Sequence, residues 1–153
     1  MVGSSNKFAH AAARAVADNP GQSYNPLFIY GESGLGKTHL LFAIKNYIEH
    51  ELPGTRVKYA NSQSYLNDYM RNLGLQRKPG EMIMSEYRDA DVLIIDDIQE
   101  LTGKTGTQNA FFNIFNHLQL AGKQLILTSD KPPVELKDIE QRLLTRFKWG
   151  LSA

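Results

Sequence analysis

The chain has 153 residues, 42% of them hydrophobic and 22% charged, a composition that fits one ordinary folded domain and excludes a disordered chain. Seventeen basic and sixteen acidic side chains leave a formal charge of +1, so any nucleic-acid contact must come from a local site rather than from long-range attraction. The sequence contains no cysteine, which excludes disulfides and thiolate zinc sites. Its apolar runs are strand-sized and its N-terminus lacks an export signal, so we expect a cytoplasmic protein without a membrane span.

The first part of the chain alternates helix and strand patterns. Residues 1–5 are interpreted as a tag or linker remnant, and helical spacing of apolar side chains predicts a helix over 8–16. The wholly apolar run 27–30 predicts a strand that is buried on both faces. After a glycine-rich turn, an apolar stripe predicts a helix over 37–49.

The same alternation continues toward the C-terminus. We expect a strand over 57–60 and a helix over 65–73, then a polar, basic interruption over 74–80 and a short helix over 81–87. The remaining expected elements are a doubly buried strand over 92–95, a helix around 111–118, a strand over 124–128 and a helix over 139–147. Repeated alternation of this kind predicts an α/β sandwich with right-handed crossovers and a mostly parallel sheet.

The glycine-rich turn has the form of a phosphate-binding loop. Residues 31–38 read GESGLGKT and fit G-x-x-x-x-G-K-[ST] between an apolar strand and an amphipathic helix. Glycines let successive backbone amides surround phosphate oxygens, and the positive end of the helix assists them. We expect Lys37 to be exposed to the ligand rather than buried in the core and to reach the β and γ phosphates, and Thr38 to place its hydroxyl on Mg²⁺. The alternative, a glycine turn followed by a chance lysine, is disfavoured because both flanking elements fit.

A second motif follows the strand at 92–95. Asp96 and Asp97 stand at its carboxyl end, where open α/β sheets bind their ligands. This is the form of a Walker B element, in which Asp96 would hold the metal and Asp97 would orient or deprotonate the attacking water. An acidic pair that merely ends a strand in a turn is the alternative. Together with the phosphate loop, the pair predicts that ATP or ADP is bound as its Mg²⁺ complex.

With both motifs in place, the chain resembles the AAA+ ATPases and, within them, the nucleotide-binding part of the DnaA family of bacterial replication initiators. The residues that carry the resemblance lie in segments spread over nearly the whole chain: 6–9, 24–31, 34–41, 96–99, 127–130 and 142–150. The resemblance implies that 6–153 form a three-layer P-loop NTPase sandwich around a mostly parallel five-stranded sheet, the large subdomain of the AAA+ fold. The family's helical lid and C-terminal DNA-binding domain are expected to be absent.

The resemblance also assigns roles to single residues. Asn6 would line the adenine end, Asp130 would sense the γ-phosphate, and Arg146 would be the arginine finger that reaches the ATP of a neighbouring subunit. Without the resemblance, Arg142 and Arg146 would be read as a solvated helix face. The residues expected to take part in ATP chemistry are Lys37, Asp96, Asp97, Asp130 and Arg146. The residues expected to contact the nucleotide are Asn6, Gly31, Gly34, Leu35, Gly36, Lys37, Thr38 and His39.

Contacts with DNA are implied at two places. Residues 63–88 fall where the family inserts a pair of helices that steers filament formation and faces single-stranded DNA, although 74–84 are more glycine-rich and basic than the family pattern. Lys104 and Thr107 match positions that contact the DNA backbone, whereas Gly106 stands where the family commonly has a basic residue. Loss of one phosphate contact predicts weaker DNA binding with a flatter salt dependence.

The resemblance therefore implies an ATP-switched initiator that forms oligomers or a filament on origin DNA and promotes strand opening. The replicative helicase and regulatory proteins would be further partners. Whether the chain is an active ATPase is left open, and hydrolysis is expected to be weak because the lid and the neighbouring subunit each supply part of the site. The alternatives are a helicase loader or regulatory relative, a small-molecule P-loop kinase, and a module that uses nucleotide for packing without hydrolysis.

Overall fold

The computed structural model describes most of the chain. The described residues are 7–18, 20–21, 25–31, 34–74, 85–103, 105–148 and 151–152. The expectations for residues 1–5 and for 75–84 therefore lie outside them. Within the described part, none of the helices combines the length and the apolar character that crossing a membrane requires.

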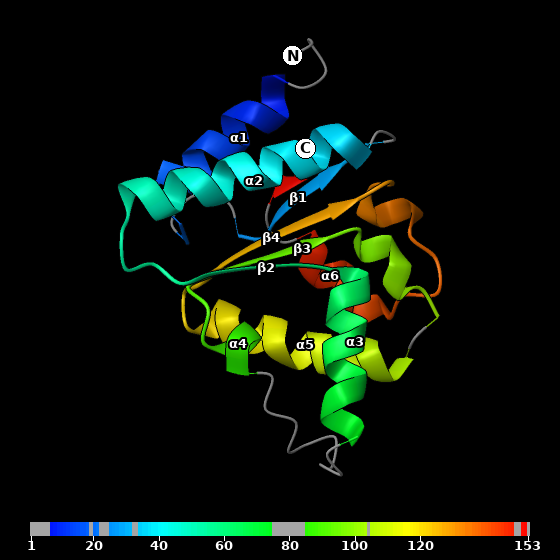
Figure 1. Ribbon diagram of the computed structural model, residues 1–153. Helices are drawn as coiled ribbons and strands as arrows, with labels where there is room; N and C mark the ends of the chain where they lie inside the picture. Colours follow the sequence, from blue (N-terminus) through cyan, green and yellow to red (C-terminus); the bar gives the residue numbers. More distant parts are fainter. Residues whose placement is uncertain are drawn as a thin grey trace.

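A parallel sheet forms the middle layer of the molecule (Figure 1). Its strand order is β2-β3-β4-β1-β5, and every neighbouring pair runs parallel. The strands are β1 (Leu27–Tyr30), β2 (Val57–Asn61), β3 (Val92–Asp96), β4 (Gln124–Ser129) and β5 (Leu151–Ser152). The expected α/β architecture with a parallel sheet is thus confirmed.

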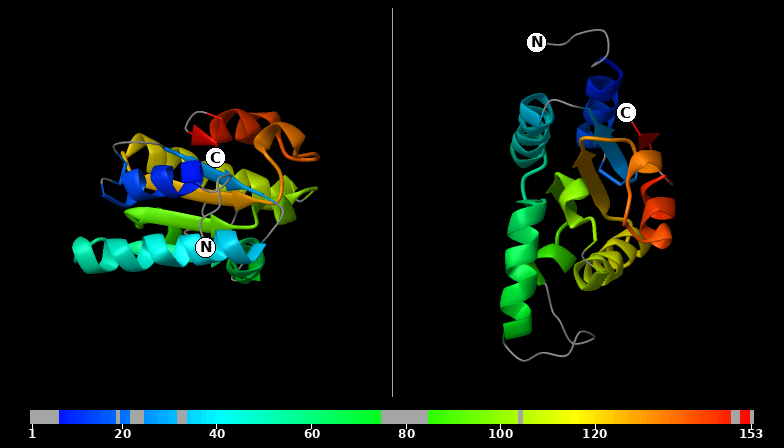
Figure 2. Two further views of the ribbon diagram at one scale, coloured as in Figure 1. Left: turned by 90° about the horizontal axis from the view of Figure 1, so that it is seen from above. Right: turned by 90° about the vertical axis from the view of Figure 1, so that its right-hand side faces the viewer.

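Helices cover both faces of this sheet, as the views in Figure 2 show. Helices α1 (Lys7–Asp18) and α2 (Gly34–Glu51) lie on one face. The helices packed on the opposite face are α3 (Ser62–Gly74), α4 (Ser85–Arg88), α5 (Thr105–Leu120) and α6 (Gln141–Phe147). Two short 3-10 helices, η2 (Ile98–Leu101) and η3 (Pro133–Glu135), follow β3 and β4.

The central strand β3 shows why the two faces are both apolar. Val92 and Ile94 belong to the core under α1 and α2, whereas Leu93 and Ile95 belong to the core on the other face. All four are fully buried, as the sequence predicted. Because side chains alternate along a strand, the next residue, Asp96, points to the same face as Ile94, toward α2. The strand therefore delivers a carboxylate to the helix that follows the phosphate loop.

Several element boundaries differ from the predictions. Helix α2 begins at Gly34 rather than at Lys37, because glycines carry no apolar side chain that would reveal a first turn. Helix α6 begins at Gln141, two residues later than expected. Strand β5 was not marked by the sequence, since two residues are too few to show a pattern.

Candidate functional site

The phosphate loop connects β1 to α2. Gly31 continues from β1, and its N–H donates to the carbonyl oxygen of Ser129 at 3.2 Å, which ties the loop to the end of β4. Apart from its own chain neighbours and the backbone of its helix, no atom of the described residues lies within 4 Å of the position that a Cβ on Gly36 would take. The ammonium of Lys37 donates to the carbonyl oxygen of Gly31. Lys37 is only 7% exposed to solvent, and its amine closes back onto the start of the loop; its accessibility to a ligand stays a prediction.

The two sequence motifs meet at one hydrogen bond. The hydroxyl of Thr38, in the first turns of α2, donates to Oδ2 of Asp96 at 2.9 Å. Asp96 ends β3 and is 3% exposed. The fold thus places the end of the phosphate loop against the first acid of the Walker-type pair at the carboxyl edge of the sheet, the usual position for a ligand in this architecture.

Two further hydroxyls from neighbouring strands reach the same carboxylate. Tyr59, on β2, donates to Oδ2 of Asp96 at 3.0 Å, and Thr128, on β4, donates to Oδ1. Burial raises the pKa of the Tyr59 phenol, and the negative charge of Asp96 raises it further, so the phenol keeps the proton that it donates. Sequence reasoning assigned no role to Tyr59 or Thr128. The available signal was a hydroxyl side chain near the carboxyl end of a strand on each side of β3.

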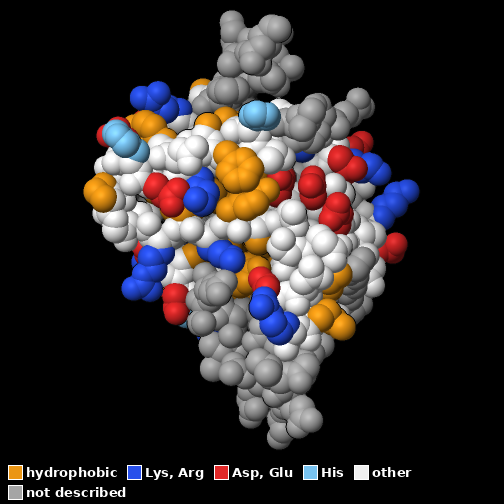
Figure 3. Space-filling model, viewed as in Figure 1, with side chains coloured by type: hydrophobic (Ala, Val, Ile, Leu, Met, Phe, Trp, Pro, Cys, Tyr) orange, Lys and Arg blue, Asp and Glu red, His pale blue; other side chains and the backbone are white. Residues whose placement is uncertain are grey.

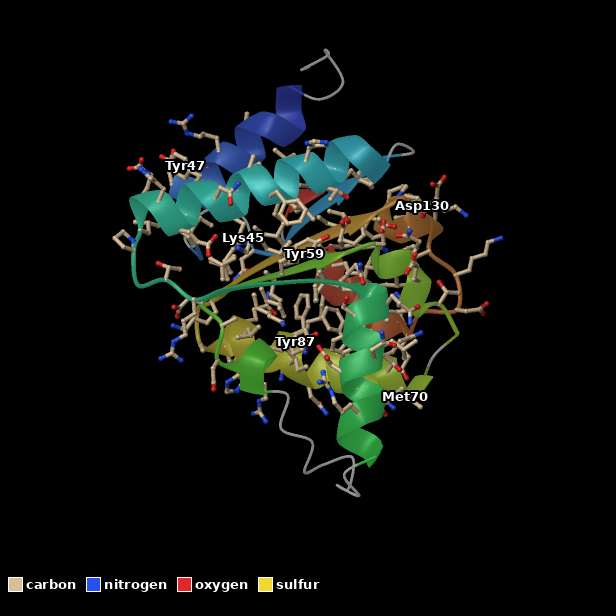
Figure 4. The ribbon with its side chains drawn as sticks, in the orientation of Figure 1. Lys45, Tyr47, Tyr59, Met70, Tyr87 and Asp130 are labelled. Carbon is tan, nitrogen blue, oxygen red and sulfur yellow. The ribbon has the colours of Figure 1, made fainter. Side chains whose placement is uncertain are left out.

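The second acid of the pair has an unusual backbone conformation. Asp97 has φ 60° and ψ 52°, in the left-handed region, where it leads into η2. Its N–H donates to the Thr128 hydroxyl at 2.9 Å, and the side-chain amide of Gln99 donates to its carboxylate at 3.4 Å. Gln99 also accepts a hydrogen bond from the N–H of Asp130 at 3.3 Å. The turn after β3 is therefore linked to the end of β4, where Asp130 is exposed (Figure 4).

The two arginines of α6 lie on the other face of the sheet. Both guanidinium groups lie over the ring of Phe112 on α5. The distance from the guanidinium carbon to the ring centroid is 4.2 Å for Arg142 and 5.0 Å for Arg146. Arg142 also donates to Glu140 at 2.7 Å and to Asn109. Arg146 is half-buried, so this pair is not simply a solvated helix face. The structure does not bring Arg146 to the Thr38 and Asp96 pair, which faces α2.

The remaining expected site residues have different outcomes. Asn6, Lys104 and the side chain of Leu35 lie outside the described part of the chain. His39 is exposed on α2, directly after Thr38. Its imidazole is therefore accessible to a ligand that binds at the phosphate loop.

The expected DNA-contact residue on α5, Thr107, offers little side-chain surface. Thr107 is 4% exposed, and its carbonyl oxygen accepts a hydrogen bond from the Tyr65 hydroxyl at 3.4 Å. A Cβ on Gly106 would lie 3.0 Å from the hydroxyl of Tyr69. A side chain at this position would need the Tyr69 hydroxyl to move by a few tenths of an ångström.

The donor atoms around Asp96 fit one class of metal. Thr38 and Asp96 offer only oxygen atoms, the ligands that Mg²⁺ prefers. Among the described residues, no group of three or more His, Cys, Asp or Glu side chains could hold a metal ion by itself. This arrangement suits Mg²⁺, which usually binds one or two carboxylates and takes its other ligands from phosphate and water.

The face that carries this site is chemically mixed. Figure 3 shows hydrophobic side chains in the middle of this face with acidic side chains beside them. Phe42 on α2 is 42% exposed, and its ring centroid lies 4.8 Å from that of Tyr59. The exposed ring of Phe42 is thus separated from the buried Asp96 carboxylate only by the side chain of Tyr59.

Comparison with known proteins agrees with this geometry. A family model of the bacterial DnaA ATPase domain matches residues 1–153. Domain III of the Thermotoga maritima replication initiation protein DnaA is 46% identical, with a TM-score of 0.92 over 99% of this chain and 62% of that one. AMPPCP-bound DnaA from Aquifex aeolicus is 39% identical, with a TM-score of 0.89 over 100% of this chain and 47% of that one. A replication initiator DnaA bound to AMPPCP and single-stranded DNA is 38% identical, with a TM-score of 0.91 and the same coverage.

Helicase loaders are more distant. The DnaC helicase loader is 20% identical, with a TM-score of 0.68 over 95% of this chain and 79% of that one, so this likeness shows a shared fold alone. The chain spans less than two thirds of the length of the DnaA structures that it matches. From the family match and these identities, the chain belongs to the bacterial DnaA ATPase domain family.

Proposed function

We propose that this chain binds ATP or ADP together with Mg²⁺ at the carboxyl edge of its sheet and acts as the nucleotide-switched module of a DnaA-type replication initiator. The observation that carries the proposal is the 2.9 Å hydrogen bond between Thr38 and Asp96. It joins the last residue of the phosphate loop to the first acid of the Walker-type pair. Support comes from the DnaA relatives whose structures hold AMPPCP.

Binding would use groups that already face one another. Backbone amides of residues 31–38 and the N-terminal end of α2 would donate to phosphate oxygens. The ammonium of Lys37 would leave the carbonyl oxygen of Gly31, its partner in this structure, and neutralise the β and γ phosphates. The Thr38 hydroxyl would turn from Asp96 to the metal, which when bound supplies positive charge against the developing charge of phosphoryl transfer.

Hydrolysis would depend on the turn after β3. Asp97 would orient or deprotonate the attacking water, held in its left-handed conformation by the hydrogen bonds to Thr128 and Gln99. Asp130, linked to the same Gln99 side chain, would sense the γ-phosphate. Arg146 lies on the face opposite α2, a position that supports a role toward the nucleotide of a neighbouring subunit rather than its own. Turnover by this chain alone would then be weak.

The switch would control assembly. ATP-dependent self-association would place copies of the protein on origin DNA, and the relative bound to single-stranded DNA supports a weak single-stranded contact by this domain. A helicase and regulatory proteins would be further partners in the cytoplasm. A helicase-loader function has only fold-level support. A small-molecule kinase would require an acceptor, and a phosphate-transfer screen that labels no acceptor would dispose of it.

A calorimetric titration with the non-hydrolysable analogue AMPPCP and Mg²⁺ tests the binding site. Lys37→Ala should weaken binding by more than about tenfold, equivalent to about 1.4 kcal/mol, while circular dichroism shows a retained fold. Lys45→Ala is the matched control, since Lys45 lies on the same helix but pairs with Glu49 at 2.8 Å. Unchanged affinity in Lys37→Ala, or an equal loss in both variants, would contradict the assignment.

A further inference from the structure

One side chain at the site belongs to neither sequence motif. Tyr59 lies on β2, the edge strand next to β3, and in the register of the two strands it pairs with Ile94 while Asn61 pairs with Asp96. Tyr59 and Asp96 therefore point to the same face of the sheet, one alternation apart. The tyrosine is long enough to reach along this diagonal, and its hydroxyl lies 3.0 Å from Oδ2 of Asp96.

Helix α2 fixes the tyrosine ring in this direction. Phe42 packs against Tyr59 with ring centroids 4.8 Å apart and an interplanar angle of 36°. Phe42 comes four residues after Thr38, so both side chains lie on the same face of α2. The helix thus carries one hydroxyl that bonds Asp96 directly and one aromatic ring that supports the second donor.

The three hydroxyls on Asp96 are not equivalent. Thr38 and Tyr59 share Oδ2, whereas Thr128 donates to Oδ1. If the Thr38 hydroxyl turns toward a metal, Tyr59 and Thr128 remain, one on each carboxylate oxygen. A carboxylate has about four lone-pair sites, so two donors can fix its orientation and leave acceptor capacity for the metal or its water.

We propose that Tyr59 is a positioning residue of the Mg²⁺–nucleotide site, holding the Asp96 carboxylate in the orientation that receives the metal when Thr38 is withdrawn. This rests on the proposed function, because it assumes that Asp96 faces the metal of a bound nucleotide. The contribution of Tyr59 is its hydroxyl, while its ring serves to aim that hydroxyl. Removing the hydroxyl should therefore affect the metal-dependent part of nucleotide affinity and leave the metal-independent part unchanged.

The measured quantity is a coupling factor, the dissociation constant of AMPPCP in EDTA divided by that in saturating Mg²⁺. Tyr59→Phe should lower this factor about tenfold, the effect of losing one hydrogen bond to a charged group, with little change in the EDTA value. Phe42→Ala should lower it less, because it frees the ring but keeps the hydroxyl. A purely structural role would lower the melting temperature and leave the coupling factor unchanged.

Two other tyrosine–aspartate pairs provide matched controls (Figure 4). The Tyr47 hydroxyl donates to Asp18 and the Tyr87 hydroxyl donates to Asp68, each at 2.5 Å. Tyr47→Phe and Tyr87→Phe remove the same kind of bond away from Asp96 and should keep the wild-type coupling factor.

The outcomes separate the two proposals. A wild-type chain that binds AMPPCP equally well with and without Mg²⁺ overturns the proposed metal site and this inference with it. Normal coupling in the wild type with unchanged coupling in Tyr59→Phe overturns the role of Tyr59 alone. An equal fall in all three tyrosine variants also overturns it, because the effect would then be general to the loss of a phenol.

Discussion

Thr128 connects both acids of the site, so its replacement tests the hydrogen-bond network directly. It is fully buried, donates to Oδ1 of Asp96 and accepts from the N–H of Asp97 at 2.9 Å. Thr128→Val keeps nearly the same shape but removes the hydroxyl. Losing a hydrogen bond to a charged group costs about 1.5–3 kcal/mol of stability, and leaving the Asp97 N–H without its acceptor adds to this. We therefore expect Thr128→Val to lower the free energy of unfolding by about 3 kcal/mol.

Thr128→Ser separates the hydroxyl from the methyl group. It keeps both hydrogen bonds and loses one buried methyl, at a cost of about 1 kcal/mol. Equilibrium unfolding in urea measures both variants, and a domain of this size with a stability of about 5–15 kcal/mol leaves room to resolve the difference. In thermal melts, about 3 kcal/mol corresponds to a fall of roughly 6–12 °C. If Thr128→Val is as stable as Thr128→Ser, the hydroxyl does not hold the two acids.

Three further substitutions address other parts of the structure. The backbone N–H of Arg56 and the ammonium of Lys123 lower the pKa of Asp91 below its ordinary 3.8, so its charged form stabilises the fold above that value and the contribution disappears as pH falls through the lowered pKa. Because the Asp91–Lys123 pair is partly exposed, Asp91→Asn should lower the free energy of unfolding by about 1 kcal/mol at neutral pH and leave it unchanged in strong acid. Urea unfolding at several pH values measures this, and a difference from the wild type that does not change with pH would count against it. Asp97→Asn tolerates the left-handed backbone and should keep AMPPCP affinity while any ATP turnover falls by about 100-fold or more; phosphate release that matches the wild type would refute its role. Arg146→Ala should keep ATP binding in this chain but reduce ATP-dependent assembly of a longer protein that contains it, measured by light scattering; normal assembly would rule out a finger in trans.

The sequence predicted the parts of the fold that depend on local pattern. Residues 92–95 are aliphatic throughout, which marks a strand buried on both faces, and the structure confirms it. The glycine-rich turn between an apolar run and an amphipathic stripe was sufficient to place the loop between β1 and α2. The two-residue strand β5 could not be found in this way, because its assignment depends on pairing with β1 rather than on its own composition.

The candidate site was predictable only in part. Thr38 and Asp96 belong to recognisable motifs, whereas Tyr59 contributes through the register of β2 against β3, which no local pattern reveals. The burial of Lys37 was also beyond sequence reasoning, since it depends on how the loop closes on the Gly31 carbonyl. Phe112 gives the arginines of α6 a partner that their spacing alone does not show.

A crystal structure of this chain with AMPPCP and Mg²⁺ tests the central claim most directly. We expect the phosphates to lie against residues 31–38 and the Lys37 ammonium to have moved from the Gly31 carbonyl to a phosphate oxygen. The metal should lie between the Thr38 hydroxyl and the Asp96 carboxylate. A nucleotide bound elsewhere, with the Thr38–Asp96 hydrogen bond unchanged and the loop lysine still on Gly31, would contradict the account.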